Sequence, residues 1–212
     1  ILFGGAYYGI FHEINNRRDL YRDVFEKYAE VKGGHVKAHN IYFRQEGDKI
    51  MGVSDLVVTN VGVQSLAHPV LYLNPGLEVT ALTGEQGENL SYTRESQAIL
   101  LEKALQPGEE ILLHLVYEGK IDEAICFPDF TNEEFHDTRL MSFFQTYHSM
   151  FRHGRCFARV GDDYTLLFPE CLWYPVAVSP VNVSAPLARQ YDFTRYRLKV
   201  GDIGERVAIS QG

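Results

Sequence analysis

The chain has 212 residues, of which 45% are hydrophobic and 23% charged, and these values exclude intrinsic disorder as its main description. The 20 basic and 28 acidic residues give a net charge of −8. DNA and RNA phosphates require clustered Lys and Arg, so this balance predicts no nucleic-acid partner. Composition alone indicates no activity.

The first eleven residues, 1–11, carry no charge. They are too few to cross a bilayer, which takes about 20 apolar residues, and no basic region precedes them as in a complete signal peptide. They could be a buried strand or helix of the domain, or the trailing end of a transmembrane helix. The residues themselves favour neither interpretation.

Between residues 16 and 31 the apolar residues recur at three- and four-residue spacing, which predicts an amphipathic helix. Its apolar stripe consists of Leu20, Tyr21, Val24, Phe25, Tyr28 and Val31. Asn16 can cap the first turn, and Gly33 and Gly34 end the helix. The polar face mixes basic residues such as Arg18 with carboxylates, which suits packing on the domain better than binding to a membrane surface.

After the two glycines the periodicity changes to two, which predicts β-strands. Residues 36–44 and 49–60 are expected to form a hairpin through the turn at 45–48. Further short runs of this kind, each bounded by turn residues, follow at 70–74, 77–82, 89–93, 98–105 and 110–117. This series predicts a mainly-β fold, an antiparallel β-sandwich.

Residues 130–153 break the β pattern and predict a helical insertion. Thr131 and Glu134 have the spacing of a capping box, and six apolar residues follow at helical spacing. Strands are expected to resume at 155–160 and 164–168. A last hairpin is expected between 192–200 and 206–210.

No catalytic or metal-binding motif is found in the sequence. His12 and Glu13 begin an HExxH-like string, but residue 16 is Asn, so the second histidine is missing. His35 and His39 share a strand face without a third ligand nearby, so solvent exposure or a satisfied hydrogen bond is expected rather than zinc. The motifs GxSxG, GxxxxGK[ST] and GxGxxG are absent. We therefore predict no catalytic residue, no bound metal and no cofactor.

The three cysteines, Cys126, Cys156 and Cys171, are isolated from one another in sequence. Their spacing excludes a zinc ribbon or finger, and their odd number argues against a disulfide scaffold. We therefore expect them to be small apolar core residues rather than bridging or reactive ones.

The most unusual segment is 168–175, which contains the only Trp, two prolines and a carboxylate. Glu170, Trp173 and Tyr174 could form an aromatic recognition surface in which the carboxylate meets an amine or another cation. Alternatively, the segment is a rigid crossing whose Trp fills the end of the sandwich, and the composition favours this structural interpretation.

Four short stretches resemble a known family in their order along the chain. Residues 105–110 and 113–121 resemble the "L-x-P-G" turn and the following strand, ending "Y-x-G-x-I", of the N-terminal β-domain of aminopeptidase-N-type zinc metallopeptidases. Residues 173–175 and 191–194 resemble that domain's aromatic-proline turn and edge hairpin. The helix near residues 15–28 and the run 71–77 resemble a narrower group, bacterial membrane proteins that fuse an ABC-transporter permease to an aminopeptidase-like region.

The departures from the family matter for function. The family's HExxH with its downstream Glu, and its GAMEN motif, belong to a catalytic domain that has no counterpart among these residues. No zinc ligand or general base is therefore carried over. Glu170 lies where the family has an acidic residue, but it is not assigned to a substrate contact. The insertion at 130–153 also lies outside the family pattern.

The resemblance implies two regions: a membrane-proximal stub with an amphipathic helix at 1–34, and a β-sandwich domain with its helical insertion at 35–212. The expected function is that of a non-catalytic, extracytoplasmic domain of a membrane-anchored ABC-type permease. It would serve as a scaffold or recognise a peptide or protein, its partners being the membrane and peptidase parts of the same polypeptide. One alternative is a substrate-cleft domain of an active zinc aminopeptidase; another is a free-standing ligand-binding β-sandwich.

Overall fold

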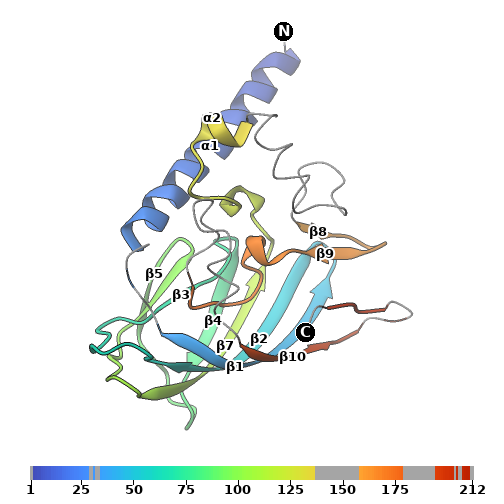
Figure 1. Cartoon of the computed structure of the whole chain (residues 1–212). Coiled ribbons are helices and arrows are strands. Elements are labelled where there is room, and N and C mark those ends of the chain that lie inside the picture. The colour runs from blue at the N-terminus through green and yellow to red at the C-terminus, as the bar shows by residue number, and fades with distance from the viewer. Residues whose placement is uncertain are drawn as a thin grey trace.

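The computed structural model describes residues 2–28, 31, 34–136, 158–178, 194–202, 204 and 207–210. Within these residues the chain is mainly β, with one long helix at its N-terminal side (Figure 1). Most of the insertion expected at 130–153, together with Cys156, lies outside the described residues.

The long helix α1 (Leu2–Tyr28) contains both the uncharged first residues and the predicted amphipathic segment. The predicted stripe is confirmed in part, because Tyr21, Val24, Phe25 and Tyr28 are buried. It is wrong for Leu20, which is 53% exposed, and for Val31, which is 39% exposed and follows the end of α1 at Tyr28. Among the described residues, no helix has both the length and the apolar character that crossing a membrane requires.

A second correction concerns Arg18, which the helical pattern places on the polar face. Its side chain is only 2% exposed. The physical reason lies outside the helix, since a loop far along the chain presents several backbone carbonyl oxygens to the guanidinium. The spacing of residues within the helix contains no information about that loop.

The main sheet has five strands in the order β10-β1-β2-β7-β4. Their bounds are β1 (His35–Glu46), β2 (Lys49–Thr59), β4 (Leu77–Thr83), β7 (Glu110–Gly119) and β10 (Arg195–Val200). β1 and β2 form the predicted hairpin, which turns at Gly47 with φ of 58°, a conformation that suits glycine. Alternating residues of β2 and β7 are buried, as expected for strands with one face on the core.

The last strand differs from the prediction. β10 pairs in parallel with β1, with Ala38 opposite Arg195 and Phe43 opposite Val200, and residues 207–210 form no strand. The expected hairpin between 192–200 and 206–210 is therefore wrong in its pairing. The free edge of β1 supplies the hydrogen-bonding groups that β10 needs, which strand patterns alone cannot show.

A second sheet, of three antiparallel strands, has the order β3-β6-β5, and two further strands form a small antiparallel pair. The bounds are β3 (Val70–Tyr72), β5 (Tyr92–Glu95) and β6 (Ala98–Leu101), and for the pair β8 (Ala158–Val160) and β9 (Thr165–Leu167). Among the described residues, three short helical turns lie between strands: η1 (Glu123–Ile125), α2 (Asn132–His136) and η2 (Pro169–Cys171).

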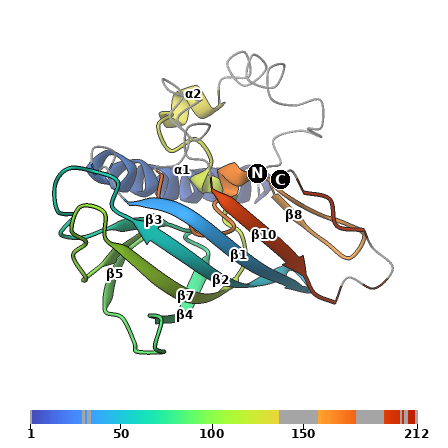
Figure 2. The same cartoon turned by 60° about the horizontal axis from the view of Figure 1, so that its bottom comes forward.

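The second sheet lies between two hydrophobic clusters. In β3, Leu71 belongs to a cluster shared with the main sheet, whereas Val70 and Tyr72 belong to a cluster shared with α1. β6 alternates in the same way, with Ile99 on the first side and Ala98 on the second. The layers are therefore main sheet, second sheet and helix, and Figure 2 shows α1 behind the main sheet.

We call the first cluster the sheet core and the second the helix core. The fully buried residues of the sheet core include Ile50, Leu56, Leu71, Leu73, Leu77, Ile99, Leu101, Leu105, Leu113, Leu115 and Tyr117. The helix core contains Tyr21, Val24, Tyr28, Val70, Tyr72, Ala98, Ala124, Ile125, Cys126, Phe130, Ala158, Cys171 and Leu172. The core assignment of Cys126 and Cys171 is thus confirmed.

Candidate functional site

The aromatic-proline segment 168–175 is fixed to the end of β3. Asn74 donates its backbone N–H to the carbonyl of Leu172 at 2.9 Å, and Tyr72 and Val176 exchange two backbone hydrogen bonds at 2.7 and 3.0 Å. Leu172 ends the short helix η2 in the left-handed conformation, with φ of 52°. These bonds hold the segment as a rigid part of the domain.

Trp173 and Tyr174 form an aromatic row along the inner face of β1. The ring of Trp173 lies edge-on to Phe43, with centroids 5.7 Å apart, and edge-on to Tyr174 at 4.6 Å. The row continues from Tyr174 to the ring of His39 at 5.6 Å. Both Trp173 and Tyr174 are half-buried against the sheet core, so most of these contacts are packing contacts.

His39 is the buried end of this row. Its side chain is 3% exposed, and its Nε2 atom has no hydrogen-bond partner among the described residues. Burial lowers the pKa of His39 from 6.5 to about 4, although the Asp55 carboxylate acts in the opposite direction. The expectation of solvent exposure or a satisfied hydrogen bond is wrong at this nitrogen, because inward-facing strand positions exclude water.

Glu170 shares no contact with the aromatic row in the interactions described for it. It sits in η2, half-exposed, and its backbone carbonyl accepts a hydrogen bond from the Cys126 thiol at 3.8 Å. In the part of the chain that the structure describes, its carboxylate makes no hydrogen bond or ion pair. The structure thus groups Trp173 with Tyr174, and a recognition role for all three residues stays a prediction.

A more elaborate polar site joins α1 to the loop that contains η1. The Arg18 guanidinium donates to the carbonyls of Ala124 and Cys126 at 3.1 and 2.8 Å. It also donates to the carbonyls of Phe127 and Phe130 at 3.0 and 3.2 Å. Burial lowers the pKa of Arg18 to about 10, so the group stays charged at neutral pH.

Asp122 is the second anchor of the same loop. One carboxylate oxygen accepts from Arg17 and from the Tyr21 hydroxyl, both at 2.8 Å. The other accepts the backbone N–H of Ala124 at 3.0 Å and so caps η1. Burial, together with the bond to Asp122, raises the pKa of Tyr21 above its ordinary value, which keeps this hydroxyl a donor.

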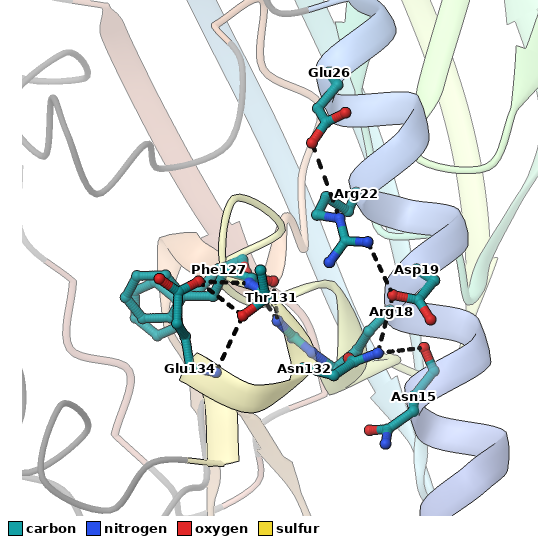
Figure 3. Close-up of polar contacts among 10 residues, drawn as sticks. Asn15, Arg18, Asp19, Arg22, Glu26, Phe127, Thr131, Asn132 and Glu134 are labelled. Atoms are coloured by element: carbon teal, nitrogen blue, oxygen red, sulfur yellow. Dashed lines mark hydrogen bonds and ion pairs between the residues drawn. The ribbon is translucent and has the colours of Figure 1, made fainter.

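A third set of contacts joins α1 to α2 (Figure 3). The Asn132 amide donates to the carboxylate of Asp19 at 2.9 Å and to the carbonyl of Asn15 at 3.3 Å. The predicted capping box at the start of α2 is confirmed: Glu134 donates its N–H to the Thr131 hydroxyl at 3.2 Å, and its carboxylate accepts the Thr131 N–H at 2.8 Å.

The residues of this helix-docking site, Arg17, Arg18, Tyr21, Asp122 and Asn132, are not predicted as a site by the sequence. A weak signal existed, because two adjacent arginines are followed by an apolar stripe. Their partners, however, lie more than 100 residues along the chain. Within the described residues, no group of three or more His, Cys, Asp or Glu side chains could hold a metal ion.

Proteins similar to this chain are found among solved structures. No model of a protein family and no curated protein matches the sequence. Among solved structures, an M1 zinc metallopeptidase from Deinococcus radiodurans is similar at 23% identity and a TM-score of 0.38, over 43% of this chain and 21% of the peptidase chain. A mutant of that peptidase bound to a Tyr-Ser-Ala substrate gives the same values.

A two-domain M1 zinc metallopeptidase mutant bound to L-arginine is also similar, with a TM-score of 0.37, 23% identity and coverage of 42% of this chain. Each match corresponds to about a fifth of the peptidase chain, 21% of its length. These structural neighbours are M1 zinc metallopeptidases, of the aminopeptidase N family.

Proposed function

We propose that this chain is a non-catalytic scaffold domain of a membrane ABC-type permease, resembling an aminopeptidase N-terminal domain and facing the extracytoplasmic side. In this proposal α1 is the structural connection between the β-domain and the membrane part of the same polypeptide. The observation that carries it is the contrast along α1, whose second half is fixed to the domain while its first half extends away from the sheets (Figure 1).

The fixed half of α1 is suited to hold a domain at a set orientation. Arg18 binds four carbonyls of one loop, and Gln97, in the turn between β5 and β6, donates to the Tyr21 carbonyl at 2.8 Å. Buried hydrogen bonds from a charged donor lose little to solvent competition and require specific geometry. A rotation of α1 would break several of these bonds at once, so the helix and the β-domain move as one body.

The extending half has a different chemistry. Residues 1–11 carry no charge, and Ile10 is 61% exposed. An apolar side chain that is left open to water, such as that of Ile10, is stabilised by contact with a second apolar surface, such as other helices or lipid. This supports an arrangement in which the first half of α1 packs against the membrane part of the protein.

The membrane location is tested by producing the complete gene product in its host and separating the membrane and soluble fractions. We expect the domain in the membrane fraction, and we expect an added protease to cut it in intact cells because it faces outward. A cytoplasmic enzyme serves as the control for cell integrity. Recovery in the soluble fraction would contradict the membrane part of the proposal, and resistance to protease in intact cells would contradict the orientation.

The non-catalytic role is tested with this chain alone. Incubated with zinc and an aminoacyl-p-nitroanilide, it should show no turnover above a zinc-only control. Zinc-dependent hydrolysis that disappears with chelator would overturn this assignment and favour the aminopeptidase alternative.

A further inference from the structure

Two cysteines that are far apart in sequence are in contact in the helix core. Cys126 ends η1, Cys171 ends η2, and their sulfur atoms are 3.9 Å apart. Neither side chain has any exposed surface. We propose that Cys126 and Cys171 are a disulfide-forming pair, which in the oxidised protein links the η1 loop covalently to η2. This inference does not rest on the proposed function.

The surrounding structure already holds the two loops together. Asn74, which is fully buried, donates its side-chain amide to the carbonyl of Cys171 at 2.7 Å and to the carbonyl of Asp122 at 3.1 Å. The Asn74 side-chain oxygen in turn accepts the Asp122 N–H at 2.9 Å. Both loops are therefore positioned without the cross-link, and a disulfide requires only that the sulfur atoms approach by about 2 Å.

Formation of the bond needs a two-electron acceptor, for which we name a small-molecule disulfide such as oxidised glutathione. One cysteine thiolate attacks the glutathione disulfide, giving a protein mixed disulfide and one glutathione thiolate. The second cysteine, as thiolate, attacks the protein-side sulfur and releases the second glutathione. The two protein thiols lose two protons and two electrons in total, and the oxidant becomes two glutathione thiols.

The position of the pair also determines when this reaction can occur. Burial, assisted by the neighbouring Cys171 thiol, raises the pKa of the Cys126 thiol well above its usual range. The thiolate is the reactive form, so a buried thiol of high pKa reacts slowly. We therefore expect the bond to form while the chain folds, or when the η1 loop separates from α1, rather than in the closed domain.

The test uses the full 212-residue chain with Cys156→Ser, which leaves only the pair. The protein is unfolded, refolded in a glutathione redox buffer, treated with N-ethylmaleimide in denaturing urea so that buried free thiols are labelled, and measured by intact mass. The expected product is free of maleimide and of glutathione, and lighter by two hydrogen atoms than the reduced chain. Matched chains that add Cys126→Ser or Cys171→Ser should instead carry one maleimide or one glutathione.

A refolded chain with native circular dichroism that carries two maleimides would overturn the inference, as would a product bridged between two chains. A second measurement covers failure of a serine variant to fold. The disulfide of the folded Cys156→Ser chain should resist dithiothreitol at least about tenfold longer than the same disulfide in urea, because the pair is buried. Equal reduction times would show that the bond is not held within the helix core and would contradict the proposal.

Discussion

The sheet core and the helix core bury similar side chains but satisfy their backbone in different ways. Around the sheet core, long strands such as β2 and β7 pair along their whole length, so their backbone groups bond to one another. Around the helix core, the η1 and η2 loops line one side in place of strands, and buried side chains supply the missing bonds: Arg18 for the η1 loop, Asn74 for η1 and η2, and Gln97 for α1. An irregular loop can line a core only where buried polar side chains form hydrogen bonds with its backbone groups.

The largest expected effect comes from removing the charged donor of the helix core. Arg18→Met should reduce the free energy of unfolding by about 4 kcal/mol, because three buried carbonyls and one partly buried carbonyl lose their donor. Urea unfolding followed by circular dichroism measures it. The matched control is Arg22→Met on the same helix, whose partners Asp19 and Glu26 lie on the surface, and it should change the free energy by less than about 0.5 kcal/mol. Equal effects would show that the buried bonds of Arg18 to the η1 loop stabilise the helix core no more than a surface ion pair does.

The sheet core should show its own sensitivity to acid at His39. Its pKa in the folded state, about 4, lies below the ordinary 6.5, so the unfolded chain binds more protons between these values. The stability that neutral, buried His39 contributes is complete above pH 6.5, decreases as the pH falls, and is lost below about pH 4. The lowering of its pKa from 6.5 to about 4 corresponds to about 3 kcal/mol of unfolding free energy.

Unfolding experiments between pH 4 and 7 should therefore show a steeper loss of stability for the native chain than for His39→Leu. Exposed carboxylates titrate in both proteins, so the difference between the two curves isolates this histidine. His12→Gln, on the exposed face of α1, is the matched control for the replacement of a histidine. Parallel curves for the native chain and His39→Leu would mean that His39 is not buried as a neutral group.

Trp173 tests whether the aromatic row supports the sheet core or serves recognition. Trp173→Ala should reduce the free energy of unfolding by about 2 kcal/mol, since a half-buried ring is lost from its contacts with Phe43 and Tyr174. Trp173→Phe should restore most of this. An unfolding free energy unchanged by the alanine variant would favour a recognition surface over a packing role, and a peptide-binding assay would then be the next measurement.

The smallest effect is expected at the rim of the helix core. Asn132→Ala removes the contacts from α2 to Asp19 and Asn15 and should cost about 0.5 kcal/mol, because both bonds are partly open to water. Glu133→Ala, on the neighbouring exposed position of the same helix, is the control for helix propensity. If both variants unfold at the same urea concentration, the contact between α1 and α2 makes no contribution.

The features that were predicted correctly from the sequence depend on short-range patterns of residues. The β1–β2 hairpin, the buried stripe of α1 and the capping box of Thr131 and Glu134 all depend on residues within a few positions of one another. These signals arise from backbone periodicity and terminal hydrogen bonds, which act over short distances.

The helix-docking site was not predictable by the same reasoning. Arg18 has the character of a surface residue until the η1 loop is placed beside it, and the contact of Cys126 with Cys171 depends on where two loops meet. The pairing of β10 also failed, because strand periodicity does not show which edge is free. Contacts between distant segments depend on the whole topology, which one sequence does not reveal through spacing.

The parallel pairing of β10 with β1 has a consequence for synthesis on the ribosome. β1 pairs with β2, the next strand along the chain, but its other edge is occupied by residues 195–200, which are made much later. Chains are made at about 5–20 residues per second, so that edge is open for several seconds in every nascent chain. An unpaired strand edge can pair with another chain, and chaperone binding during this interval would protect β1 until β10 arrives.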